Sequence, residues 1–374
     1  MYLVETNGLF GGVIAMVNVD YRHKGRHVDV QLGHHIELDV AVLAADVWAY
    51  VDSHIQRTFP QGDAKRALEF WRQAERFASN LRSERYEASP LHLYYMILNA
   101  TKALLVLRKL APPVVVTRAA VATDDFSSHG IASLPSPRPN GQLPGSVKPK
   151  KNGVYSLLAK AMNDKLKSSY SLEELVSSVV CVHRAYCTTR KTAEKFIPVS
   201  GPFRLKQLNG NAKVFFEAWL PKHVQVNSVS GAMPEGLECG AYPTKATKGE
   251  PKPYIRQKGR RPTAILRDTK QLGVWHAKLR RSVHVIASQN GPSYYVCRSD
   301  TSPTDLSQLS LNFAVAFALS SLARYHPDTL QEVLTGKDGW VIKEYLCATP
   351  QQFVALIAAE ITGRIIQRPY SDLR

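Results

Sequence analysis

The chain has 374 residues, which is enough for one large domain or two to three small ones. Its 44% hydrophobic and 21% charged residues are ordinary for a globular protein and exclude a wholly disordered chain. The net charge of +17, from 48 Lys and Arg against 31 Asp and Glu, indicates polyanionic partners such as nucleic acid, unless it reflects a generally basic proteome.

The cysteines and the apolar segments bear on where the protein works. Five scattered cysteines are too few for a disulfide scaffold, which predicts reduced thiols and a cytoplasmic protein. The nearest candidate for a membrane span, residues 8–19, is shorter than the ~18–20 apolar residues required and lacks the flanks of a signal peptide. We therefore expect no membrane partner. Met16 is an alternative start, which would leave residues 1–15 outside the native protein.

The N-terminal elements begin with an extension, residues 1–40, in which alternating polarity predicts a short strand at 27–32. Beyond it, apolar residues follow the i, i+3/i+4, i+7 rule and predict a helix over 40–51. A Pro-Gln-Gly break follows. The next predicted helix covers 64–83, with Asp63 as its N-cap.

The most apolar helix of the N-terminal half is predicted over 89–110, where a Ser-Pro pair opens it. It is apolar on nearly every side, which predicts burial on several sides. Asn99 and Lys102 interrupt it and, being three residues apart, share a face. Residues 122–153 are rich in Pro, Gly and Ser and are predicted to form a long loop.

Helices resume after this loop at 154–163 and at 171–183, the second capped by Ser171. The hydrophobic period then changes from helical spacing to alternation. This change predicts strands at 213–219 and 223–226.

The remaining elements are a hairpin and the C-terminal helices. Residues 281–287 and 294–297 are predicted to pair as a β-hairpin, because the Asn-Gly dipeptide between them is a strong hairpin signal. A buried helix is predicted over 307–325 and stops at Pro327. A final helix is predicted over 349–366, where a Thr-Pro pair would cap it.

These elements predict an α+β, mainly α protein, in which N- and C-terminal helices form a bundle that carries a β-rich basic insert. The expected domains are the extension 1–40, a helical domain 41–200 with the long loop 122–153, the insert 201–300, and C-terminal helices 301–374 that pack on the helical domain.

The insert holds the densest charge. Residues 243–284 contain twelve Lys and Arg but only two carboxylates, a net charge of +10. Tyr254 and Trp275 lie among them, where aromatic rings could stack on bases. Phosphate contacts here would be salt-sensitive and largely independent of sequence, whereas the alternative is a solvated charged loop. The candidate nucleic-acid-binding residues are Lys245, Lys248, Lys252, Arg256, Lys258, Arg260, Arg261, Arg267, Lys270, Trp275, Lys278, Arg280 and Arg281.

Catalytic motifs are weak. Helical RNases of the HEPN type need an Arg and a His a few residues apart, and Arg22…His27 and Arg85…His92 match that spacing. With 25 Arg and 12 His, about two such matches arise by chance, so Arg85 and His92 are weak candidates only. No nucleotide-binding glycine motif, GxSxG or HExxH sequence occurs. This favours a protein that is not an enzyme.

Metal ligands are equally sparse. Cys181, His183 and Cys187 are suitable ligand types, but structural zinc usually needs two ligand pairs, and no second pair is present. We therefore expect neither a metal nor a cofactor.

Several segments resemble the YaaC-like family of bacterial proteins, whose activity is not established. They are the helix 90–105 (PLHLYYMILNATKALL), His129-Gly130, residues 151–154 (KNGV), and 319–327 (LSSLARYHP). The resemblance spans about residues 46–366. The first helix also resembles HEPN-type helices, which is compatible with a relative that does not cleave RNA.

Two cations in apolar helices, Lys102 and Arg324, need a partner, a polar cavity or a path to water. We therefore consider Asn99, Lys102, His129, Arg324 and His326 as candidates for a polar pocket between the two helices. The alternative is that each lies at a helix edge and reaches water separately.

Three functions remain open. The first is a non-enzymatic, nucleic-acid-associated protein that binds DNA or RNA without sequence preference, as a subunit of a bacterial defence or regulatory complex with a protein partner. The second is a HEPN-like RNase or another hydrolase with an unrecognised site. The third is a purely structural protein–protein interaction module.

Overall fold

The computed structural model describes most of the chain. The described residues are 22–23, 26–27, 42–81, 86–111, 115–116, 122–123, 126, 128–134, 143–200, 203–208, 211–222, 224–242, 252–258, 264–265, 279, 282–287, 293–299, 305–364 and 366–367. The chain divides into two compact units. We call Ala44–Glu194 with Thr304–Thr362 the helical unit, and Met1–Leu43 with Lys195–Pro303 and Gly363–Arg374 the β-rich unit. The predicted class, α+β and mainly α, is confirmed.

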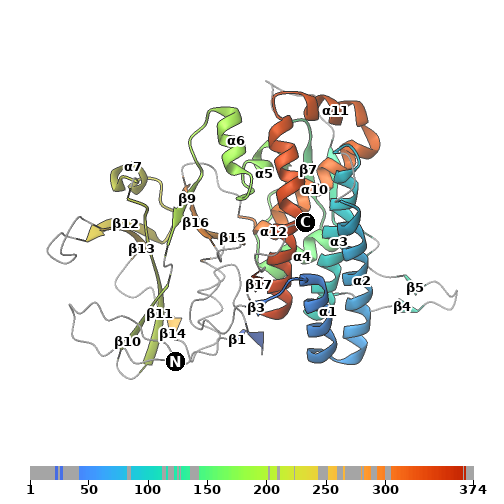
Figure 1. Ribbon diagram of the computed structural model, residues 1–374, viewed down its shortest axis with the longest axis horizontal. Coiled ribbons are helices and arrows are strands. Elements are labelled where there is room, and N and C mark those ends of the chain that lie inside the picture. Colours follow the sequence, from blue (N-terminus) through green and yellow to red (C-terminus); the bar gives the residue numbers. More distant parts are fainter. Residues whose placement is uncertain are drawn as a thin grey trace. The chain divides into compact units, whose positions relative to one another are not determined.

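The core of the helical unit is a bundle of helices from both ends of the chain, as predicted. Helix α3 packs against α2, α10 and α12, and α1 packs against α2 and α12 (Figure 1). Helices α3 and α10 are buried along most of their length because both are apolar nearly all round. The long helices are α1 (Val47–Thr58), α2 (Gln61–Asn80), α3 (Ser89–Leu107), α10 (Gln308–Tyr325) and α12 (Gly339–Thr362).

Smaller elements complete the helical unit. Strands β6, β7 and β8 form an antiparallel sheet in that order, and β4 pairs with β5. The helices are α4 (Val154–Met162), α5 (Leu172–Val176), α6 (His183–Arg190) and α11 (Pro327–Thr335). The strands are β4 (Val115–Val116), β5 (Ala122–Thr123), β6 (Ile131–Leu134), β7 (Ser146–Pro149) and β8 (Tyr170–Ser171).

The β-rich unit contains two antiparallel sheets with the strand orders β10-β11-β13-β12 and β15-β16-β9; β14 also pairs with β11. The predicted hairpin is confirmed, because β15 and β16 pair with Val283 opposite Val296. The strands of the two sheets are β9 (Phe196–Val199), β10 (Phe203–Leu208), β11 (Asn211–Trp219), β12 (Leu237–Tyr242), β13 (Lys252–Gln257), β14 (Ala264–Ile265), β15 (Val283–Ile286) and β16 (Ser293–Cys297). The other pairs are β1 (Arg22–His23) with β2 (Arg26–His27), and β3 (Val42–Leu43) with β17 (Ile366–Gln367).

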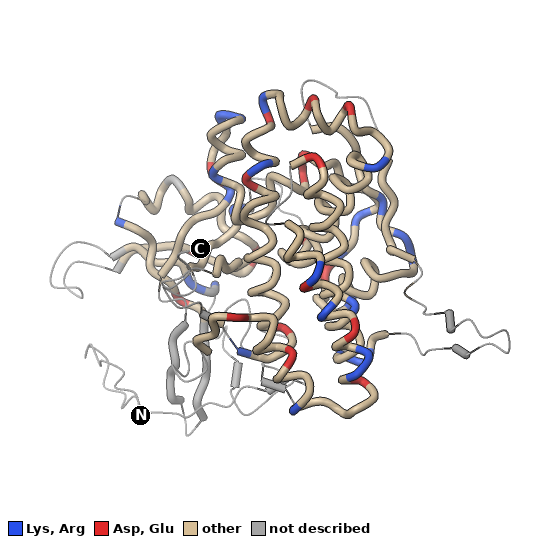
Figure 2. Tube along the Cα trace, turned by 45° about the vertical axis from the view of Figure 1, so that its right-hand side comes forward, with Lys and Arg blue, Asp and Glu red and all other residues tan. Residues whose placement is uncertain are grey.

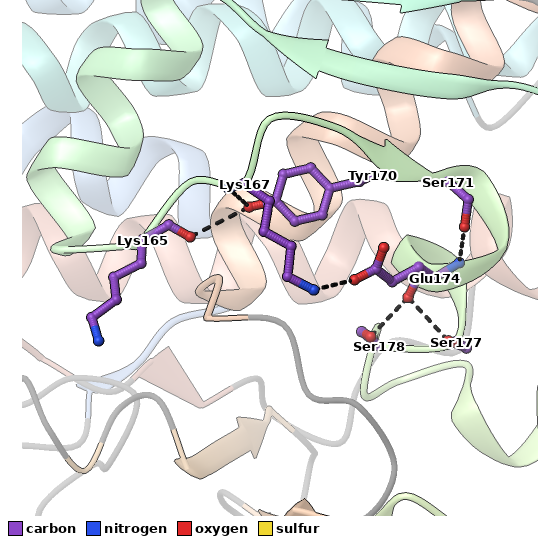
Figure 3. Close-up of polar contacts among 7 residues, drawn as sticks. All are labelled: Lys165, Lys167, Tyr170, Ser171, Glu174, Ser177 and Ser178. Carbon is purple, nitrogen blue, oxygen red and sulfur yellow. Dashed lines mark hydrogen bonds and ion pairs between the residues drawn. The ribbon is translucent and has the colours of Figure 1, made fainter.

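Ser171 begins α5, as its residue type predicts. Its hydroxyl accepts the Glu174 N–H at 3.0 Å (Figure 3). The Glu174 carboxylate accepts from the Lys167 ammonium at 2.7 Å, and the Tyr170 hydroxyl accepts from the Lys167 N–H at 2.7 Å. These contacts hold the short strand β8 against the start of the helix.

Three helix starts differ from the predictions. Helix α1 begins at Val47 rather than 40, because the Asp46 carboxylate caps it by accepting from two backbone N–H groups. Val42 and Leu43 instead form β3. Helix α2 begins at Gln61 after Pro60, so that Asp63 lies in the first turn and is not the N-cap. Helix α12 begins at Gly339 and includes Pro350, which was predicted to start it.

Three further segments also differ. The predicted loop 122–153 contains strands β6 and β7, which pair through Ile131 and Pro149. The predicted helix 171–183 stops at Val176, where α5 ends. The predicted strand 223–226 is wrong in its described residues: the Val224 N–H turns back to the Pro221 carbonyl at 3.0 Å, and α7 (Val226–Ser230) follows. Alternation over four residues is too short to outweigh such a turn.

Candidate anion-binding site

The backbone segment that carries His129 passes close to the first turn of α4, where Gly130 of the segment lies against Gly153 at the start of the helix. Gly130 and Gly153 have φ values of +75° and +120°, a region that favours glycine. The carbonyl of His129 accepts the Tyr155 N–H at 3.0 Å, which ties the segment to the first turn of α4. A Cβ on Gly153 would lie 2.4 Å from the Gly130 nitrogen. Backbone contact therefore fixes the position of His129.

Replacing Gly153 with alanine should accordingly destabilise the helical unit. The strained φ alone costs on the order of 1–3 kcal/mol, and the clash with backbone adds to it. Gly62→Ala in α2 is the matched control, because a Cβ there meets nothing within 4 Å. We expect that variant to keep or slightly raise stability. Urea unfolding followed by circular dichroism compares them, and equal midpoints would contradict the assigned Gly130–Gly153 contact.

Tyr94 connects this segment to the bundle. Its ring is fully buried on α3, and its hydroxyl is hydrogen-bonded to His129 Nδ1 at 2.7 Å. The Phe317 ring of α10 lies against both, with centroid distances of 5.4 Å to Tyr94 and 6.0 Å to His129. Side chains from α3, from α10 and from the segment that carries His129 are therefore in contact with one another.

Positive charge dominates around His129. Burial lowers the pKa of His129, and the nearby cations Arg324, Lys102 and Lys150 lower it further. Burial also raises the pKa of Tyr94, so both rings are neutral at pH 7. Among the described residues, the charged groups that shift the pKa of His129 are Arg324, Lys102 and Lys150, which are all cations. The potential here therefore favours a bound anion.

The two principal cations, Arg324 and Lys102, both contact aromatic rings. The Arg324 Nε donates to the Ser320 carbonyl at 3.3 Å, and the guanidinium lies 5.5 Å from the Tyr325 ring centroid. The Lys102 ammonium lies over the rings of Phe70 and Phe126, at 5.2 and 5.5 Å. An aromatic face therefore lies against each of these two side chains.

The five predicted pocket residues do not all gather here. Arg324 and Lys102 both act electrostatically on His129, whereas the Asn99 amide donates to the Tyr95 carbonyl of its own helix at 2.8 Å. His326 is exposed at the end of α10 and lines a separate cavity. Sequence reasoning missed Tyr94. The available signal was its place eight residues before Lys102, because i and i+8 lie on one side of a helix.

The nucleic-acid-binding candidates are described only in part. The described ones are Lys252 and Arg256 on β13 and Lys258 just after it. Arg256 Nε pairs with the Glu238 carboxylate of β12 at 2.7 Å, so a carboxylate offsets its charge, while Lys258 is exposed. The candidates outside the described residues are Lys245, Lys248, Arg260, Arg261, Arg267, Lys270, Trp275, Lys278, Arg280 and Arg281.

The nuclease candidates lack the required context where they are described. Arg85 lies outside the described residues, and the His92 ring is half-buried 6.0 Å from the Phe77 ring. Arg22 and His27 are backbone partners in the β1–β2 pair, not neighbours on a helix.

The metal-ligand candidates have structural surroundings. His183 Nδ1 donates to the Val180 carbonyl at 2.8 Å, and burial raises the pKa of the Cys181 thiol to about 12. Over the described ranges, no three His, Cys, Asp or Glu side chains are grouped to hold a metal ion. The same part of the chain has no helix with the length and apolarity to cross a membrane.

Comparison with known proteins gives one match. A family model described as YaaC-like Protein matches residues 49–361. No curated protein and no solved structure matches the chain. The segments that carry the resemblance, in α3, α10 and the Gly130–Gly153 contact, are those that meet around His129.

Proposed function

The chain belongs to the YaaC-like protein family, and we propose that this member binds nucleic acid in the cytoplasm, through phosphate contacts that do not depend on sequence and without cleaving it. The helical unit would serve to dock a protein partner, as in a defence or regulatory complex.

The observation that carries this proposal is the division of charge between the units. The β-rich unit contains 24 Lys and Arg against 12 Asp and Glu, a net charge of +12. The helical unit contains 24 against 19, a net charge of only +5. Figure 2 shows both signs of charge on its helices. Residues 243–284 supply +10 of the excess, a concentration suited to neutralising phosphates.

The cationic group around His129 adds a second, smaller source of positive potential. It lies in the helical unit, where Arg324 donates to the Ser320 carbonyl and the Lys102 ammonium lies over the Phe70 ring. A phosphate near His129 would oppose the two cations and favour the protonated imidazole. Phosphate binding there would therefore raise the pKa of His129.

A salt titration tests the proposal. We expect labelled single-stranded RNA, single-stranded DNA and duplex DNA to bind at low salt, with an affinity that falls linearly on logarithmic axes by about 0.7–0.9 per phosphate neutralised. The recovered nucleic acid should be intact. Absence of binding at low salt would remove the proposal, and cleavage would favour an RNase instead.

Matched charge reversals locate the binding. The triple variant Lys258→Glu, Arg260→Glu, Arg261→Glu should weaken binding and flatten the salt slope. The control reverses three exposed cations of the helical unit, Lys160, Lys165 and Lys191, to glutamate. Equal losses would mean that net charge alone causes the binding.

A further inference from the structure

A small cavity lies between the β6–β7 hairpin and the C-terminal half of α10. Its volume is about 210 Å³, less than the roughly 300 Å³ of sites that enclose drug-sized ligands. The space is therefore suited to a ring system and not to a whole nucleotide. It is lined by Ser133, Pro144, Gly145, Phe317, Ala318, Ser321, Leu322, Tyr325 and His326.

The lining combines aromatic rings with polar groups. Phe317 is buried, while Tyr325 is 69% exposed, an unusual position for a large aromatic residue. Ser133 supplies a hydroxyl group and His326 an imidazole, while the Ser321 hydroxyl donates to the Phe317 carbonyl at 3.0 Å and can still accept. Aromatic surface with a few hydrogen-bonding groups is the composition that receives a nucleobase.

A cation accompanies the exposed ring. Arg324 precedes Tyr325 on α10, and its guanidinium lies 5.5 Å from the ring centroid. Within the described residues, the Arg324 guanidinium contacts the carbonyl and hydroxyl of Ser320 and the Tyr325 ring, and no carboxylate. An apolar peptide side chain in the cavity would form no ion pair with the Arg324 guanidinium, whereas the phosphate of a stacked nucleotide would form one.

We propose that this cavity takes one base of a single-stranded nucleic acid, which stacks on Tyr325 while its phosphate contacts Arg324. The inference rests on the proposed function and narrows it, since a base paired within a duplex is not free to enter such a cavity. Single-stranded nucleic acid is then the preferred ligand. Binding at this point is additional to the salt-sensitive contacts of the β-rich unit.

The test compares fluorescence anisotropy of labelled oligothymidine, an abasic oligonucleotide of equal length and the matching duplex. Tyr325→Ala should weaken oligothymidine binding about tenfold, because one stacked base is lost, and should leave duplex and abasic binding unchanged. Tyr325→Phe should bind like the wild type, since stacking needs the ring and not the hydroxyl. Trp340→Ala, which removes an aromatic residue 53% exposed on α12, is the control and should have no effect.

The outcomes separate this inference from the proposed function. If the wild type binds duplex and single strand equally and Tyr325→Ala changes neither, the base site is wrong and the phosphate-binding proposal stands. If Tyr325→Ala weakens all three ligands alike, the stacking assignment is also wrong. If the wild type binds none of them, both fail.

Discussion

Arg190→Met is expected to lower the free energy of unfolding of the helical unit by about 3–5 kcal/mol, because it removes the cation shared by the buried Asp338 and the mostly buried Glu173. The Arg190 guanidinium lies 2.9 Å from Glu173 and 2.9 Å from Asp338. The exposed fractions of the three side chains are only 13%, 14% and 7%. Urea unfolding monitored by far-UV circular dichroism measures the loss, since the long helices all lie in this unit.

Helix α6, which carries Arg190, also supplies the control for this prediction. Arg184 of α6 pairs with Glu194 at 2.7 Å, but these side chains are 66% and 42% exposed. Exposed pairs contribute about 0–1 kcal/mol, so Arg184→Met should cost little. Arg190 of α6 contacts Glu173 of α5 and Asp338, which directly precedes α12. If the two variants lose similar stability, these contacts do not hold the three helices together.

The second large effect is expected at the ion pair between Arg108 and Glu360, which joins the end of α3 to α12. The Glu360 side chain has no exposed surface, whereas 23% of Arg108 is exposed. Arg108→Met removes this cation from a fully buried carboxylate and should cost about 3–5 kcal/mol. Glu360→Leu should cost less, because Arg108 still reaches solvent and donates to the Ala161 carbonyl at 3.2 Å.

A double-mutant cycle completes this measurement. Combining Arg108→Met with Glu360→Leu replaces the pair with apolar side chains, which in buried settings is often neutral. We expect the double variant to recover most of the stability that Arg108→Met loses. Strictly additive losses in the cycle would show that the two residues do not depend on each other.

Part of the candidate site could be predicted from the sequence. His129, Arg324 and Lys102 stand out because polar residues are conspicuous in apolar helices and Gly-flanked loops. The hydrogen bond between Tyr94 and His129 and the Gly130–Gly153 contact could not be predicted from the sequence, because each joins segments that are distant in the chain. Tyr94 and His129 are 35 residues apart, and their hydrogen bond exists only because α4, α3 and α10 pack around them.

Local patterns determined which segments of this protein are helical or paired and how several of them begin or end. The apolar spacing of α3 and α10, the cap at Ser171 and the β15–β16 hairpin all depend on neighbours in sequence. Tertiary packing decided the rest. Helix α12 continues through Pro350, and the turn before the proline is held to α10, where Tyr345 and Thr349 are hydrogen-bonded to Asn312. Contacts between residues distant in sequence can outweigh a local signal that ends a helix, and the local sequence pattern does not predict those contacts.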